Sequence, residues 1–185
     1  MRIIGGKNQR KQIIAPAKLP VRPTTDMAKE ALFNILNNHF DFEQLHVLDL
    51  FAGTGNISYE FASRGAQQII AVDINHHCTG FIRKTAEELG FDQLKVVRAD
   101  SFQFLGICKV KFDVVFADPP YDLKDIAEIP RRVFEASILN PGAWLVLEHG
   151  EHMNLTHLPF FAEKRKYGKV HFSFFHQPVS DEDQH

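Results

Sequence analysis

Apolar residues recur along this chain in two patterns, one helical and one typical of buried strands. Between residues 26 and 40 they lie at helical spacing, which predicts an amphipathic helix with Thr24 or Thr25 as its N-cap. Further on, β-branched runs predict strands at 46–51, 68–73, 94–98, 112–117 and 143–148. Helices are predicted at 56–64, 75–89 and 124–137. Two last strands, 160–167 and 170–176, surround Gly168 and predict an antiparallel hairpin.

The predicted strands are apolar on both faces, as Ile69–Val72 and Val114–Phe116 illustrate. Such strands are typical of a central parallel sheet that helices cover on both sides. Because strands and helices alternate along the chain, the pattern favours a doubly wound α/β fold. The final hairpin would close this sheet at one edge.

The first 23 residues differ from the rest of the chain in charge and in pattern. Ile3–Ile4 and Ile13–Ile14 flank a basic stretch, which predicts two short strands joined by a charged turn. Residues 1–24 carry six basic and no acidic residues, so the remainder of this −2 chain carries a net charge of −8. Such a segment fits either a nucleic-acid-binding arm or a solvated edge strand. We expect a basic hairpin arm over 1–23, one folded domain over 24–178 and a disordered tail over 179–185.

Composition excludes several classes of protein. A chain of 185 residues with 44% hydrophobic and 24% charged residues matches an ordinary globular domain. No apolar run approaches the roughly 18 residues of a membrane helix, and we expect no secretory signal. Cys78 and Cys108 are too few for a disulfide scaffold or a cysteine-rich zinc site. We therefore expect a cytoplasmic protein in which both cysteines are small, buried residues.

The first predicted strand leads into Asp49–Asn56, a loop with glycines at 53 and 55. These glycines allow a sharp turn from strand to helix and a close approach of a ligand to the main chain. Ser58 replaces the third glycine of the dinucleotide-binding pattern, and the Asp49 carboxylate would repel a pyrophosphate. The loop therefore favours a cationic or zwitterionic ligand over NAD.

Acidic residues also end the next two predicted strands. Asp73 is placed to accept hydrogen bonds from both ribose hydroxyls of a nucleoside. Asp100 either reaches an adenine amino group or caps a turn that begins at Ser101. Because parallel strands end in one crevice, these residues and Asp49 together outline a nucleoside site.

The fourth predicted strand ends in Asp118-Pro119-Pro120-Tyr121. The two prolines lack backbone N–H groups and fix φ, so the carbonyls of this turn are free to accept hydrogen bonds from outside. A carboxylate, a carbonyl and an aromatic ring then converge. This arrangement suits a planar base with an exocyclic amine, whose hydrogens the acceptors bind while Tyr121 stacks on the ring.

Together these motifs resemble the S-adenosylmethionine site and the (D/N)PP(Y/F) motif of class I amino-methyltransferases. Four other segments narrow the resemblance to the RsmD family, which methylates N2 of guanine in 16S ribosomal RNA; they are Val21–Asp26, Glu30–Leu36, Arg2–Gly6 and Ser63–Ala66. The resemblance covers residues 1 to about 176. It implies a Rossmann-like fold with a mostly parallel, seven-stranded sheet and an N-terminal β-hairpin extension.

The resemblance also implies S-adenosylmethionine as the cofactor and a role for each motif residue. Arg22, Thr24 and Thr25 would close over the methionine end, Asp73 would bind the ribose and Asp100 the adenine. The backbone and carboxylate side of the cofactor would be held by Asp49, Phe51, Gly53 and Gly55. Phe102 would either flank the adenine or pack in the core.

The target base would be held by Asp118, the Pro119 carbonyl and Tyr121, with Asp118 as acceptor and orienter first. The RNA would be contacted by Arg2, Lys7, Arg10 and Lys11. A second basic cluster, Lys164–Lys166 with Lys169, would either extend this contact or form solvated surface.

The resemblance implies 16S rRNA or the small ribosomal subunit as partner. The lack of a long apolar run predicts no membrane contact, and one domain of near-neutral charge is compatible with a monomer. Three alternatives stay open: methylation of adenine N6 in DNA or RNA, methylation of a glutamine amide in protein, and a non-catalytic RNA-binding relative. Glu148–His152 is not an HExxH motif, so we expect no metal, and we assign Glu148 no role.

Overall fold

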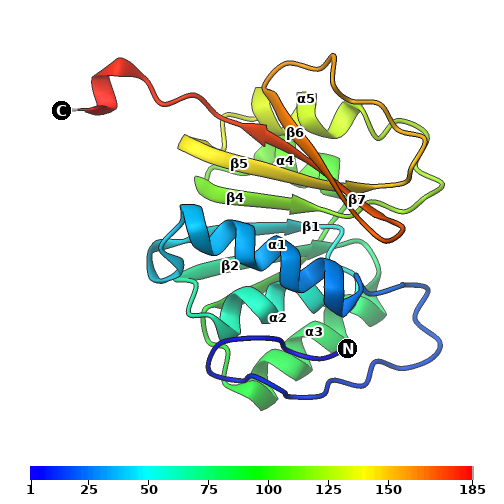
Figure 1. Cartoon of the computed structure of the whole chain (residues 1–185). Helices are drawn as coiled ribbons and strands as arrows, with labels where there is room; N and C mark the ends of the chain where they lie inside the picture. Colours follow the sequence, from blue (N-terminus) through cyan, green and yellow to red (C-terminus); the bar gives the residue numbers. More distant parts are fainter. Residues whose placement is uncertain (185) are drawn as a thin grey trace.

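The computed structural model, which describes residues 1–184, contains a seven-stranded sheet with helices on both faces (Figure 1). The strand order is β3-β2-β1-β4-β5-β7-β6. The strands are β1 (His46–Leu50), β2 (Gln68–Asp73), β3 (Leu94–Arg98), β4 (Phe112–Ala117), β5 (Leu139–His149), β6 (Phe161–Tyr167) and β7 (Val170–His176). The helices are α1 (Asp26–His39), α2 (Asn56–Ser63), α3 (His76–Leu89), α4 (Ser101–Ile107) and α5 (Glu128–Glu135).

The predicted α/β fold is confirmed. Strands β1 to β5 pair in parallel, and β7 pairs antiparallel with both β5 and β6, so the sheet is mixed. The order reverses between β1 and β4, where open α/β sheets bind their ligands. The candidate motifs after β1 and β4 therefore lie side by side.

Three elements differ from the predicted ones. Helix α4 was not predicted, because its seven residues bury only a short apolar stripe around Phe104 and Leu105. β5 begins at Leu139, several residues early, since Pro141 and Gly142 conceal the strand in the sequence. Helix α5 is shorter than predicted and begins at Glu128, because the residues before it form turns.

The predicted N-terminal hairpin pairs as expected, but its arms are too short and irregular to form strands. Residues 1–13 form no strand and share a single antiparallel bridge, Arg2 to Gln12. The amide groups of Ile4 and Gly5 donate to the Glu60 carboxylate instead of to a second strand, at 2.9 Å each. Backbone hydrogen bonds also cross the segment, from the Ile3 amide to the Lys11 carbonyl at 3.0 Å and from the Ile13 amide to the Met1 carbonyl at 2.9 Å, so it is held both by its own pairing and by α2. Ile3 and Ile13 are buried in the main core.

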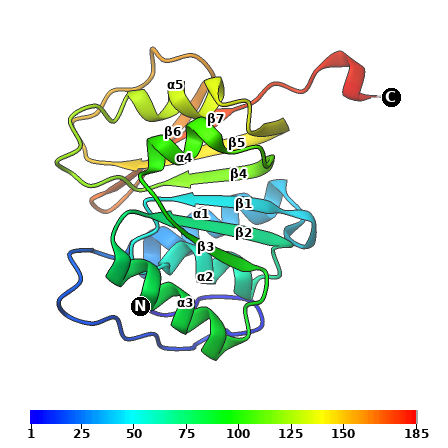
Figure 2. The same cartoon turned by 180° about the vertical axis from the view of Figure 1, so that it is seen from behind.

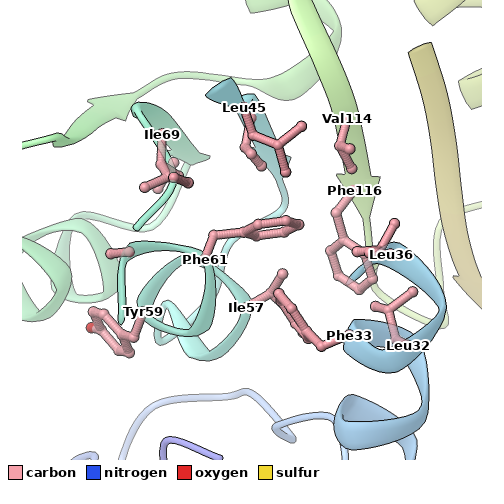
Figure 3. Close-up of a cluster of buried hydrophobic side chains, with 14 of the residues drawn as sticks. Leu32, Phe33, Leu36, Leu45, Ile57, Tyr59, Phe61, Ile69, Val114 and Phe116 are labelled. Atoms are coloured by element: carbon pink, nitrogen blue, oxygen red, sulfur yellow. The ribbon is translucent and has the colours of Figure 1, made fainter. Parts of the chain in front are cut away.

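Apolar side chains fill both faces of the sheet. Helices α1, α2 and α3 cover one face and α4 and α5 the other, as the view from behind shows (Figure 2). On the first face, Phe33 of α1 packs edge-on against Phe61 of α2, at 4.7 Å between ring centroids, next to Phe116 of β4 (Figure 3). This packing fixes the two helices that begin at the candidate site.

No helix among the described residues is both long and apolar enough to cross a membrane. Asp181–Gln184 forms a 3₁₀ turn, and residue 185 of the predicted tail lies outside the described residues. Cys78 is buried as expected, but Cys108 at the end of α4 is only half-buried.

Candidate active site

The loop between β1 and α2 has an unusual backbone. Phe51, Gly53 and Gly55 take positive φ values of 58°, 57° and 84°. A Cβ at Gly55 would lie 2.7 Å from the Tyr59 ring, so packing as well as φ requires glycine there. The loop thus turns sharply at the carboxyl end of β1, as the glycine spacing predicted.

Asp49 lies beneath this loop and is 2% exposed. Its Oδ2 accepts a hydrogen bond of 2.6 Å from the Ser58 hydroxyl. Burial raises the pKa of Asp49 to about 7, although the bond from Ser58 lowers it. A cation placed beside this carboxyl group would favour its ionised form.

Asp73 and Asp100 already have partners within the protein. The Asp73 carboxylate accepts from the amides of Gly53 (2.8 Å) and Asn75 (2.9 Å). Asp100 caps α4, its Oδ1 accepting from the amides of Phe102 and Gln103 at 3.0 Å. Because each carboxylate oxygen has two lone pairs, both side chains retain capacity to bind a nucleoside.

Two further carboxyl groups meet at the ends of β4 and β5. Ala117 pairs with Leu147, which places Asp118 beside Glu148. Strand alternation puts both on the same face of the sheet as Asp49. Burial raises the pKa of Asp118 well above its usual range, and the negative charges of Glu148 and Asp49 raise it further. Burial also raises the pKa of Glu148.

The turn after β4 leaves its acceptors free. The Pro120 carbonyl accepts from the Leu123 amide at 3.0 Å and closes the turn. Within residues 1–184, no donor of the protein bonds to the Pro119 carbonyl or to the Asp118 carboxylate. Tyr121 is 81% exposed, so its ring is open to a partner.

The segment before α1 reaches this site through Thr24. The Thr24 hydroxyl donates to Glu148 Oε2 at 2.7 Å, and its carbonyl accepts from Asn56 Nδ2 at 3.1 Å. Thr25 is the N-cap of α1, which confirms one of the two predicted caps. Arg22 is exposed. The structure therefore brings Thr24 to the carboxylates, while Thr25 caps α1.

A groove of about 350 Å³ runs beside the glycine loop. It lies between Thr54 and the segment from residue 12 to residue 23, and most of its lining is apolar. Val21, on the rim, lies 3.3 Å from the position of a Cβ on Gly53. None of the buried carboxyl groups is among the described residues that line this groove. The carboxyl groups themselves fit a cofactor that joins a nucleoside to a positively charged chain.

Sequence reasoning missed a buried polar network behind the site. Lys29 Nζ donates to Asn56 Oδ1 at 2.8 Å and to the Arg2 carbonyl at 2.5 Å, and it lies 3.5 Å from the Glu60 carboxylate. Lys29 is 1% exposed and Glu60 is fully buried. A signal was present, because Lys29 falls on the apolar stripe of α1 with Phe33 and Leu36.

Three of the four predicted RNA-binding residues share one turn, and Arg2 lies apart from them. Arg2 pairs with Asp26 at 3.1 Å, beside the start of α1. Lys7, Arg10 and Lys11 are exposed on a turn at the far end of α2, where the Lys7 amide donates to the Ser63 carbonyl at 2.7 Å. Among the described residues, no group of three or more His, Cys, Asp or Glu side chains could hold a metal ion.

Comparisons with known proteins agree with this geometry. The chain is 26% identical over 179 residues to a protein of Buchnera aphidicola subsp. Baizongia pistaciae named ribosomal RNA small subunit methyltransferase D, covering 95% of this chain and 91% of the relative. A Haemophilus influenzae protein of the same name is 32% identical over 141 residues, 71% of this chain and 72% of the relative. The structure of a hypothetical protein from Thermus thermophilus superposes with a TM-score of 0.84 at 27% identity, covering 97% of this chain and 99% of that one.

A family model provides the last comparison. The model described as "Conserved hypothetical protein 95" matches residues 1–176, nearly the whole chain. This match and the relatives confirm the predicted resemblance. The chain belongs to the conserved hypothetical protein 95 family, the family of RsmD-type methyltransferases.

Proposed function

We propose that this protein transfers a methyl group from S-adenosylmethionine to the exocyclic N2 amine of a guanine in 16S ribosomal RNA. Its family membership makes it an S-adenosylmethionine-dependent rRNA methyltransferase. The choice of guanine N2 rests on the resemblance to the RsmD family. We further propose that it acts in the cytoplasm, as a monomer, on the small subunit or its RNA.

The observation that carries the proposal is the pair of free acceptors after β4. Asp118 and the Pro119 carbonyl accept no hydrogen bond from the described part of the protein, and the exposed Tyr121 lies next to them in the chain. We propose that they accept the two hydrogens of an exocyclic amine while the tyrosine ring stacks on the base. Such a base must first leave its stack, which favours an unpaired guanine.

S-Adenosylmethionine supplies, when bound, a methyl group on a positively charged sulfur. Asp49, Asp73, Asp100 and Thr24 would hold it, the first through charge and the next two through their remaining acceptor capacity. The guanine amine is a poor nucleophile because its lone pair is delocalised into the ring. By accepting the amine hydrogens, Asp118 and Pro119 orient this lone pair toward the methyl group. Most of the acceleration then comes from orientation, and Asp118 takes the proton released from the methylated amine.

The test is methyl transfer from labelled S-adenosylmethionine to undermethylated small subunits, naked rRNA and DNA, with nucleoside mass spectrometry of each product. N2-methylguanosine in rRNA is the expected product. N6-methyladenosine would contradict the target, and absence of transfer despite cofactor binding would point to a protein substrate or a non-catalytic relative.

Substitution of Asp118 tests the role of the site. Asp118→Ala should abolish transfer while S-adenosylmethionine still binds, because the acceptor for the amine is lost. Asp122→Ala changes an exposed acid in the turn that follows Asp118, so it is the control and should retain activity. Turnover by Asp118→Ala would remove the proposed role.

A further inference from the structure

The turn between β6 and β7 lies at the edge of the sheet that carries Asp118. β7 runs antiparallel to β5, and Phe172 is the partner of Glu148. Strands lie about 4.8 Å apart and rise about 3.3 Å per residue, so the Lys169 backbone lies on the order of 11 Å from that of Glu148. On the other side, a Cβ on Gly168 would lie 3.4 Å from Met27 Cε, so the turn also meets the first residues of α1.

This turn is rich in exposed cations. The segment Glu163–Lys169 contains four basic residues and one acidic residue. Arg165 is paired with Glu163 at 3.0 Å, and Lys166 lies 4.0 Å from Glu151. Within the described residues, the side chain of Lys169 is exposed and forms no ion pair or hydrogen bond. Its charge is therefore available to a polyanion.

The N-terminal basic turn lies at the end of α2 that points away from the glycine loop. It is bound to Ser63 at the last turn of α2, whereas the glycine loop precedes the first residue of that helix. Eight helical residues span about 12 Å. A phosphate bound at Lys7 would thus lie at the opposite end of α2 from the site, and one bound at Lys169 would lie beside it.

We propose that the β6–β7 turn, through Lys169 and Lys166, binds the RNA backbone next to the target base, and that the N-terminal turn contacts RNA further away. The inference rests on the proposed function, because it takes ribosomal RNA as the polyanion. Phosphate contacts set the register of RNA on a protein, so this turn would help to place one base over Asp118.

Charge reversal at three exposed lysines tests the inference. Lys169→Glu removes the proposed contact, and Lys7→Glu removes a remote one. Lys109→Glu is the matched control, because this exposed lysine precedes β4 and so lies at the opposite end of that strand from Asp118. Each variant is measured for binding and methylation of two RNAs, the full-length small-subunit RNA and its shortest stem-loop that binds the wild type. Binding of S-adenosylmethionine is measured alongside.

We expect Lys169→Glu to weaken binding of the stem-loop about three- to tenfold and to reduce the slope of log affinity against log salt by about one. S-Adenosylmethionine binding should not change. Lys7→Glu should lose more affinity for the full-length RNA than for the stem-loop, and Lys109→Glu should match the wild type on both.

Two results would overturn the inference. If Lys169→Glu binds the stem-loop like the wild type, the lysines only keep an edge strand solvated. If Lys7→Glu loses as much affinity for the stem-loop as Lys169→Glu, the β6–β7 turn is not the part of the protein that contacts RNA next to the target base. Because binding is measured apart from methylation, a wild type that binds RNA without methylating guanine would contradict the proposed function and leave the inference standing.

Discussion

At the scale of single residues, Glu148 is the group that joins the separate parts of the site. Its carboxylate lies beside Asp118 and accepts the Thr24 hydroxyl at 2.7 Å. Thr24 in turn is held by Asn56 of α2. One buried acid therefore holds the segment before α1 and also sets the electrostatic surroundings of the residue proposed to orient the amine.

Two substitutions separate these effects. Thr24→Val removes the hydrogen bond but keeps the Glu148 charge, so it should raise KM for S-adenosylmethionine about fivefold, the loss expected for one buried hydrogen bond.

Glu148→Gln keeps an acceptor for Thr24 but removes the charge that raises the pKa of Asp118. When kcat/KM of the Glu148→Gln variant is plotted against pH, the fall at low pH should therefore occur at a lower pH than in the wild type. A fall at the same pH, or at a higher one, would contradict the coupling.

Sequence analysis identified the acidic residues that belong to recognisable motifs, but it assigned no role to Glu148, which lies outside them. Asp49, Asp73, Asp100 and Asp118 follow strands and glycine or proline turns, so their chemistry was predictable. A single acid at the end of a fifth strand has no such context. Lys29 and Glu60 were missed because each seemed an ordinary charge on a helix, and only packing pairs them.

At the scale of elements, boundaries in the interior were predicted well and those of the N-terminus were not. β2, β3, β4 and β7 have the predicted limits. For β2 and β4 the reason is that buried parallel strands are continuous apolar runs. The N-terminal segment has alternating apolar residues but bonds to the Glu60 carboxylate and to Ser63. A pattern of apolar residues predicts which side chains are buried, but it cannot show which element accepts the hydrogen bonds of the backbone amides.

Gly6 tests how firmly this segment is docked. Its φ is +78°, and a Cβ would lie 2.0 Å from the Ser63 carbonyl oxygen, part of a rigid backbone. Gly6→Ala should cost about 2 kcal/mol or more in the free energy of unfolding, measured in urea, and expose the segment to protease.

Gly80 is the matched control for this experiment. It lies within α3, and a Cβ there would meet nothing within 4 Å. Gly80→Ala should therefore stabilise the protein by about 0.5–1 kcal/mol through helix propensity. Equal, small effects of the two substitutions would show that residues 1–13 are not docked on α2.

At the scale of the whole molecule, acidic residues lie in the interior of the site and basic residues lie on the surface around it. The first 24 residues carry +6, whereas the remaining chain carries −8 and places buried or half-buried acids at the ends of β1, β4 and β5. A cationic cofactor is attracted to these acids. Anionic RNA is repelled by them and finds its partners among exposed lysines, which keeps the two substrates on separate surfaces.

This division predicts a pH dependence of cofactor binding. The pKa of Asp49 is raised to about 7, so the free protein holds a proton there at lower pH and must release it before a cation binds. The affinity for S-adenosylmethionine should therefore fall about tenfold from pH 8 to pH 6, measured by calorimetry. S-Adenosylhomocysteine has the same amino-acid end without the sulfonium charge and should show a smaller decrease.

Asp49→Asn is the variant that assigns this effect. Its amide oxygen can still accept from Ser58, but it has no proton to release, so the affinity of the variant for S-adenosylmethionine should depend less on pH.

The Asp49→Asn substitution should also raise the free energy of unfolding of the protein without cofactor, by about 1–3 kcal/mol at pH 8 and by less at pH 5. The sign follows from the raised pKa. The stability that protonated Asp49 contributes is complete below its ordinary pKa and is lost as the pH rises through about 7. A wild-type affinity that is constant from pH 6 to pH 8 would show that Asp49 does not sense the bound charge.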